Sequence, residues 1–423
     1  MLVVTSNWCV SDGTLAAGPP RRLVDRFRAE VRKASLRAGF RCDGSYRPVD
    51  AIDVVLAGDT FDWLISREWT GDVRPWDDGR RAAAARDRVV FGAIGRSHRL
   101  LATLAAWMRR GIEVPVADRR GRPMSTASRL VPVRIAVLRG DRDRWLEQAV
   151  SDWMYPARAA MPMVGTCWSD GDVAVRHGEE IDPLHTACGS EPTLGESLAV
   201  DLIARFGAAL DGLAGVGPLA AGLVRRLAGG RFIDAPTRLV GWLSAHDCGA
   251  MLPTTLRQRL VDAWHRSVGL WHRAARRLPS GGVAGVDLVE RIADWLERAT
   301  GGDGQPPRPR FETIPGSGVP LFGESATTVL LGHPAADPSA SAAWRRQVVC
   351  LGPGALQPGD HPDDHDRAPA VVLVRPGRKE RQIEWLPLDT VAATVGWQDD
   401  DHLVRGVWLS AVPRGTAGIV DAA

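Results

Sequence analysis

Short apolar runs alternate with long helical patterns over the first 180 residues of the chain. Each run contains β-branched residues, as buried strands typically do. The segments between them have helical period and are rich in Ala, Leu and Arg. The expected strands are Leu2–Thr5, Ile52–Ala57 and Arg134–Leu138, with helices over Arg21–Arg37 and Arg80–Arg110 and a later hairpin within Met163–Arg176. This strand-helix-strand alternation predicts the α/β class.

A second pattern begins near residue 191, where one helical segment follows another as far as residue 300. The expected helices are Leu194–Leu213, Leu219–Leu227, Pro236–Ala245, Thr254–Arg277 and Val286–Arg298. A linker rich in Gly and Pro follows, and strand patterns then resume at Thr327–Leu331, Gln347–Leu351, Ala370–Val374 and Leu403–Leu409. We therefore divide the chain into a first core part (1–190), a helical insertion or cap (191–309) and a β-rich closing part of the core (310–423).

Composition narrows the possible partners and compartment. The chain has 423 residues, of which 45% are hydrophobic and 24% charged, as in an ordinary globular protein. A net charge of +3 gives no clear indication of a nucleic-acid partner. No C-x-x-C pair, secretion signal or apolar run of about 18 residues is present, so we expect a cytoplasmic protein without membrane insertion.

Polar residues beside glycines follow four of the expected strands. The blocks are Gly58-Asp59-Thr60-Phe61-Asp62, Gly140-Asp141-Arg142-Asp143, His177-Gly178 and Gly332-His333. Each block alone is common in sequences, and a glycine-aspartate turn needs no functional explanation. Four such blocks in order are much less expected by chance. Open α/β sheets bind ligands at the carboxyl ends of their strands, so the blocks predict a functional site there.

These ordered blocks resemble the calcineurin-like metallophosphoesterase superfamily, over about residues 1–190 and 325–355. Its blocks are D-x-H, G-D-x-x-D, G-N-H-D/E, H-G and G-H-x-H. The resemblance implies a four-layer α-β-β-α sandwich carrying a helical insertion, and a pair of metal ions that activate a phosphate ester. It assigns one metal to Asp59, Asp141, His177 and His333. The ligand positions of the other metal are degenerate, since they hold Asn7, Cys9 and Ala335.

The candidate catalytic residues are Arg142 and Asp143, because Arg142 stands where the superfamily has its catalytic histidine. Arginine cannot donate a proton near neutral pH. It can instead replace the charge of the missing metal, or clamp a phosphate. Cys9 could be a small filler or a thiolate zinc ligand, and His177 and His333 could be packing residues. One divalent transition metal (Mn, Fe or Zn) fits these residues, and a pocket without metal fits equally well.

The sequence therefore predicts a divergent metallophosphoesterase-like protein, catalytically impaired, that binds a phosphate-bearing ligand or a protein partner. One alternative is an active single-metal phosphomonoesterase or phosphodiesterase. Another is a structural subunit that docks through the helical insertion. Two further expectations concern single residues. We expect His185 to lie at the surface. We expect Trp264 and Trp271 to pack in the core, and the alternative is that they form a partner-binding face.

Overall fold

The structure of the chain is a computed structural model, and the part of it described here excludes several segments. The described residues are 1–6, 8–16, 21–41, 43–147, 149, 162–170, 173–177, 184–185, 191–213, 216–228, 232, 235–244, 252–278, 286–300, 327–331, 347–351, 371–376 and 381–386.

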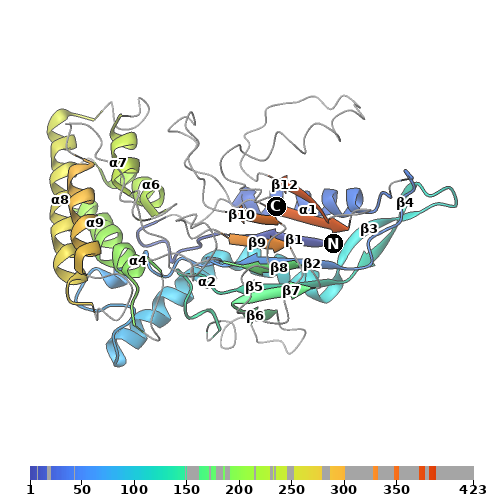
Figure 1. Ribbon diagram of the computed structural model, residues 1–423, viewed down its shortest axis with the longest axis horizontal. Coiled ribbons are helices and arrows are strands. Elements are labelled where there is room, and N and C mark those ends of the chain that lie inside the picture. Colours follow the sequence, from blue (N-terminus) through green and yellow to red (C-terminus); the bar gives the residue numbers. More distant parts are fainter. Residues whose placement is uncertain are drawn as a thin grey trace, which may run out of the picture.

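A six-stranded mixed sheet forms the centre of the molecule (Figure 1). Its strand order is β12-β11-β1-β2-β5-β6. The strands β1, β2, β5 and β6 are parallel, while β11 and β12 add antiparallel strands at one side. Their bounds are β1 Leu2–Thr5, β2 Ile52–Ala57, β5 Val133–Leu138, β6 Met163–Gly165, β11 Val371–Pro376 and β12 Arg381–Leu386. Every residue of β1 and β2 is buried, as expected for parallel strands covered on both faces. The predicted α/β class is confirmed.

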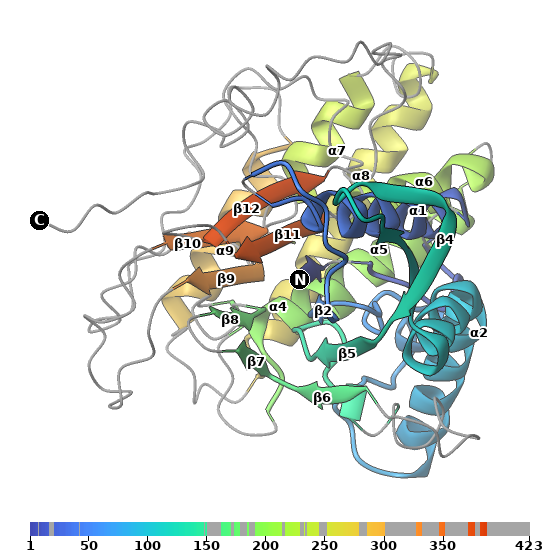
Figure 2. The ribbon, with the colours of Figure 1, turned by 90° about the vertical axis from the view of Figure 1, so that its right-hand side faces the viewer.

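Two long helices cover one face of this sheet, and a second sheet lies on the other (Figure 2). Helix α1 (Arg21–Ala38) contacts β11, and helix α2 (Arg80–Arg110) contacts β5. The second sheet has the order β10-β9-β8-β7, and its strand β8 contacts β2. Its strands are β7 Cys167–Asp170, β8 Val173–Arg176, β9 Thr327–Leu331 and β10 Gln347–Leu351. The described residues thus form one helical layer and two sheet layers.

The helices after residue 191 form a separate group, which we call the helical unit (residues 191–300). In Figure 1 it lies beyond one end of the parallel strands. Its elements are α4 Leu194–Ser197, the π-helical η3 Leu198–Ala204, α5 Arg205–Asp211, α6 Gly217–Ala228, α7 Ala235–Ser244, α8 Thr254–Ala275 and α9 Val286–Arg298. Trp264 and Trp271 are fully buried, and Trp264 donates from Nε1 to the carbonyl of Leu296 at 3.0 Å. Their predicted role in core packing is confirmed.

Some elements were not expected. A two-stranded arm, β3 (Ile112–Ala117) and β4 (Pro123–Val131), projects from the end of α2, and most residues of β4 are at least partly exposed. A short 3-10 helix, η1 (Arg67–Trp69), follows the loop after β2. The strand expected at Leu403–Leu409 lies outside the described residues. Among the described helices, none combines the length and apolar character needed to cross a bilayer.

A candidate metal centre at the carboxyl ends of the parallel strands

The loops that follow β1 and β2 run side by side, because the two strands are parallel neighbours. The amide of Cys9 donates to the carbonyl of Asp59 at 2.9 Å, and the amide of Val10 donates to that of Thr60 at 3.1 Å. Both Cys9 (φ 45°) and Asp59 (φ 50°) adopt the left-handed conformation, which is unusual for residues other than glycine. Such local strain is often found at functional sites, and here it turns Asp59 toward the strand ends.

Two glycines of the sequence blocks are required by close approach. A Cβ atom at Gly58 would lie 2.1 Å from Nδ1 of His177, and one at Gly140 would lie 2.2 Å from Oδ1 of Asp59. Gly58 also has a φ of 85°, which favours glycine. The glycine beside each aspartate therefore makes room for a polar side chain from another block.

Three side chains from different blocks converge on one buried point. Asp59, Asp141 and His177 each offer a ligand atom, and these atoms all lie within 4.8 Å of one another. Nε2 of His177 is 2.9 Å from Oδ1 of Asp141 and 3.5 Å from Oδ2 of Asp59. Its Nδ1 is 3.0 Å from the carbonyl of Ala57, which can only accept a hydrogen bond. We therefore place a proton on Nδ1, so that Nε2 faces the two carboxylates.

This group of side chains fits a divalent transition metal. Two carboxylates and one imidazole form a donor set typical of manganese, iron and zinc sites, and the carbonyl of Ala57 orients the imidazole as a second-shell partner does. One atom of the group, Oδ2 of Asp141, is buried and has no hydrogen-bond partner. Asp59, Asp141 and His177 would hold the ion, and a bound ion would supply Lewis acidity toward a phosphate oxygen. His333, Ala335 and Asn7 lie outside the described residues.

Arg142 is buried beside this group, and its guanidinium lies among carboxylates, a backbone carbonyl and an aromatic ring. Its Nε lies 3.3 Å from Oδ2 of Asp59, and its Nη1 lies 3.1 Å from Oδ2 of Asp62. Nη1 also donates to the carbonyl of Ala228 at 2.7 Å, and Cζ is 4.5 Å from the centre of the Phe232 ring. Ala228 ends α6, where the helix dipole is negative and favours a cation. These contacts favour charge replacement over phosphate clamping as the role of Arg142.

The carboxyl groups of the pocket have strongly separated pKa values. Burial, and then the charge of Asp141, raises the pKa of Asp59 to about 6, although Arg142 and His177 oppose the shift. Burial would also raise the pKa of Asp141, but the neighbouring imidazoles of His185 and His177 outweigh it and hold the pKa below its ordinary value. Asp141 is therefore ionised at neutral pH, and Asp59, about one pH unit above its pKa, is mostly ionised. The pair resembles sites in which the environment gives two carboxyls different states.

Asp143 lies behind the pocket rather than among the convergent ligand atoms. Its Oδ1 accepts from the amide of Gly140 at 2.7 Å, and its Oδ2 accepts from the amide of Phe61 at 3.3 Å. Burial, and then the charge of Asp59, raises the pKa of Asp143 to about 8. The residue thus joins the loops after β2 and β5 and is mostly protonated at neutral pH.

Cys9 is partly exposed at the end of the β1 loop, and its thiol is not one of the convergent ligand groups among the described residues. Burial by neighbouring protein raises the pKa of the Cys9 thiol well above its ordinary value, and the charge of Arg142 only partly opposes this. The thiol is therefore protonated at neutral pH. Because the Cys9 sulfur is not among the convergent ligand atoms of the described residues, its position favours a filler over a thiolate ligand.

His185 is the residue of this site that sequence reasoning missed. The expected surface position was wrong, because His185 is only 6% exposed and its Nδ1 lies 3.2 Å from Oδ2 of Asp141. Its position depends on packing against Gly195 of the helical unit, where a Cβ atom would lie 2.2 Å from the imidazole. A glycine ten residues further along the chain gives no sequence pattern that predicts this contact.

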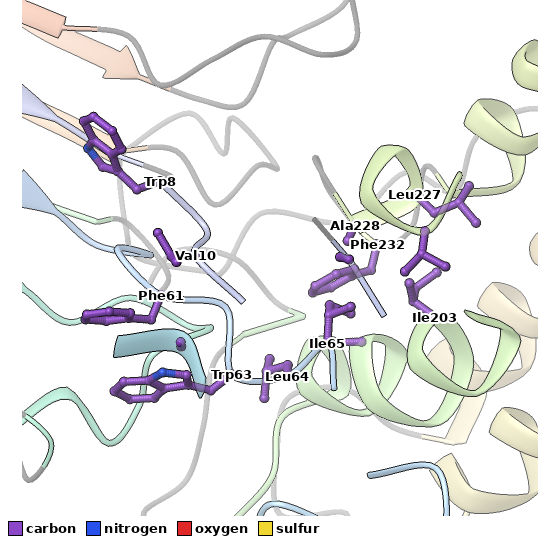
Figure 3. Close-up of a cluster of buried hydrophobic side chains, with 14 of the residues drawn as sticks. Trp8, Val10, Phe61, Trp63, Leu64, Ile65, Ile203, Leu227, Ala228 and Phe232 are labelled. Carbon is purple, nitrogen blue, oxygen red and sulfur yellow. The ribbon is translucent and has the colours of Figure 1, made fainter. Parts of the chain in front are cut away.

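The helical unit closes over the pocket. Figure 3 shows a cluster of buried apolar side chains in which Ile65, from the loop after β2, lies beside Phe232 and Ile203 of the helical unit. Two ion pairs also join the parts: Arg74 to Asp201 at 2.6 Å and Arg144 to Glu196 at 3.2 Å. The pocket is therefore built from both the sheet and the helical unit.

Comparison with known proteins gives no relative: no family model, curated protein or solved structure matches the chain. The class of protein is thus defined by its fold and site alone, as an α/β protein with a buried cluster of carboxylates, histidines and one arginine.

Proposed function

We propose that the chain is a divergent metallophosphoesterase-like protein, impaired in hydrolysis, that holds one divalent transition metal and binds a phosphate-bearing ligand. The observation that carries the proposal is the position of Arg142. Its guanidinium pairs with Asp59 and Asp62 inside the pocket, at the place in the sequence where the superfamily has a proton-donating histidine. A permanent cation at this position neutralises carboxylates but gives no proton to a leaving group.

The balance of charges in the site supports the proposal of a single divalent ion. With Asp143 protonated, the pocket holds three carboxylates, from Asp59, Asp62 and Asp141, against the single charge of Arg142. Buried charges require partners, so two further positive charges are needed. One divalent ion supplies both. Two divalent ions together with Arg142 would leave the pocket with excess positive charge.

In this proposal each side chain has a defined role toward a ligand. Asp59, Asp141 and His177 hold the ion, and the carbonyl of Ala57 fixes the imidazole orientation. Arg142 keeps Asp59 ionised and ties the pocket to α6 through the carbonyl of Ala228. The helical unit excludes water from the site. A divalent ion in such a site can bind a phosphate oxygen and stabilise its negative charge, which is the basis for proposing a phosphate-bearing ligand.

The four-layer sandwich is part of the same proposal. One helical layer and two packed sheets support it, and the fourth layer would cover the outer face of the sheet that contains β7 and β8. Convergence of Asp59, Asp141 and His177 also favours a second candidate function, an active single-metal phosphoesterase. A protein partner that docks on the helical unit is the remaining alternative.

Turnover and phosphate binding test the proposal together. The metal-loaded protein should bind inorganic phosphate or a phosphomonoester in a calorimetric titration, and it should hydrolyse generic phosphomonoesters and phosphodiesters very slowly or not at all. Asp59→Ala, which removes a ligand, should abolish the phosphate binding, whereas Asp87→Ala on the exposed side of α2 should not. A turnover above about 1 s⁻¹ that disappears in Asp59→Ala would establish the active enzyme instead.

A further inference from the structure

His185 occupies a position that is shaped for an imidazole. Its ring lies against Gly195, whose missing side chain leaves the space: a Cβ atom there would lie 2.2 Å from Cε1 and 2.5 Å from Nδ1 of His185. The amide of Gly195 donates to the carbonyl of Leu184 at 2.6 Å, which fixes the backbone on both sides of the contact. The Phe232 ring, 6.5 Å away between centres, lies on another side.

The first turn of the helical unit holds this contact in place. Thr193 and Glu196 form a capping box, in which the hydroxyl of Thr193 accepts from the amide of Glu196 at 3.0 Å and the carboxylate of Glu196 accepts from the amide of Thr193 at 2.7 Å. The same carboxylate pairs with Arg144, on the loop after β5, at 3.2 Å. Gly195 therefore has a fixed position relative to the loop that carries Asp141.

Two buried atoms face each other at this point without completing a hydrogen bond. Oδ2 of Asp141 and Nδ1 of His185 lie 3.2 Å apart, and neither has a hydrogen-bond partner, although both side chains are 96% buried or more. The distance is already that of an ion pair, and only the angle is unsuitable. Leaving both atoms unsatisfied is unfavourable, so a small rotation of either group that aligns them would stabilise the pocket.

We propose that His185 is a positioning residue of the metal site. It donates from Nδ1 to Oδ2 of Asp141 and thereby holds Oδ1, the oxygen that faces His177, toward the ion. The inference rests on the proposed function, since it requires a metal at Asp59, Asp141 and His177. It adds that the helical unit sets metal affinity through Gly195. Loss of a second-shell partner of this kind weakens metal binding by about 10- to 100-fold.

The test is a cobalt(II) titration of the full-length metal-free protein, followed by visible absorption and by calorimetry. The dissociation constant for His185→Ala should rise about 10- to 100-fold, with an altered absorption spectrum. His185→Asn should recover part of the affinity, because its amide places an N–H near the position of Nδ1. Gly195→Ala should weaken binding by displacing the ring. The matched control is His98→Ala, at an exposed histidine of α2 whose Nδ1 lies 3.0 Å from the carbonyl of Gly95, and it should behave as wild type.

Three outcomes would overturn the inference. Equal cobalt affinity and equal spectra for wild type and His185→Ala would remove His185 from the site while leaving the metal site itself intact. An affinity for His185→Asn no better than that for His185→Ala would show that packing, and not the N–H donor, is what matters. Failure of the wild-type protein to bind cobalt would refute the proposed metal site as well. If His185→Ala does not fold, comparing the cobalt affinity of His185→Asn with that of wild type decides between the first two of these outcomes.

Discussion

Replacing Arg142 by methionine would remove the internal cation and keep most of the side-chain volume. The change leaves Asp59 and Asp62 without their ion-pair partner, and it leaves the carbonyl of Ala228 without its donor. Removing one partner of a buried ion pair destabilises a protein by about 3–5 kcal/mol. We expect a loss in the free energy of unfolding of this size at pH 8.

Proton uptake limits the loss and gives it a pH dependence. Arg142 lowers the pKa of both carboxyls, so its removal raises them, and the folded variant binds more protons than wild type. Protonating Asp59, with a wild-type pKa of about 6, requires only about 1.4 kcal/mol at pH 7 and nothing below its pKa. The stabilisation that Arg142 gives through Asp59 therefore grows as the pH rises above about 6, is complete above the raised pKa of the variant, and is lost as the pH falls to about 6.

Urea unfolding at several pH values between about 5 and 8, followed by tryptophan fluorescence, measures this difference. The matched control is Arg99→Met, because Arg99 pairs with Asp25 at 2.6 Å on the surface, with side chains 42% and 46% exposed. An exposed pair contributes about 0–1 kcal/mol, so the control should change little. A loss below about 1 kcal/mol for Arg142→Met at pH 8, or a loss that is the same at pH 5 and pH 8, would refute charge neutralisation by Arg142.

The remaining predictions concern the glycine of the β5 loop and the reversal of the degenerate positions. Gly140→Ala should lower the free energy of unfolding by about 1–3 kcal/mol, because its Cβ would lie 2.2 Å from Oδ1 of Asp59. The control Gly71→Ala places its Cβ in open space and should have little effect. Equal shifts of the thermal unfolding temperature in the two variants would contradict this prediction. A reversal variant, in which the superfamily residues are restored at the four degenerate positions, should gain a second metal and measurable phosphodiesterase activity. Arg142→His alone should restore little activity, because residues that act as a unit are strongly non-additive. If the folded reversal variant binds no second metal, the geometry of the pocket, and not only its ligands, has changed. The reversal combines four substitutions: Asn7→Asp, Cys9→His, Arg142→His and Ala335→His.

The elements that the sequence predicted are those with a strong local pattern. Strands β1, β2 and β5 are mostly apolar and rich in β-branched residues, and the helices of the helical unit have clear helical period. Both sets appear where expected within a few residues. The arm of β3 and β4 was not predicted. Its strand β4 is mostly polar and exposed, and it begins at a proline, so neither hydrophobic alternation nor an uninterrupted run marks it.

The residues of the site also fall into those that a local sequence pattern predicts and those that it does not. Asp59, Asp141 and His177 were placed by local patterns, since each follows a strand and lies beside a glycine. The role of Arg142 stayed open in the sequence because it depends on Ala228 and Phe232, more than 80 residues away. The position of His185 was wrong for the same physical reason. Both residues take their environment from the docking of the helical unit, which no local pattern records.

The central claim is that Arg142 takes the place of a second metal, so that the pocket holds one divalent ion. Elemental analysis of the protein after saturation with manganese, iron or zinc and removal of loosely bound metal tests this most directly, with Asp59→Ala as the reference for specific binding. The account predicts one ion per chain in wild type and none in Asp59→Ala. Two ions per chain that both depend on Asp59, about 3.5–4 Å apart as in dinuclear hydrolases, would contradict it.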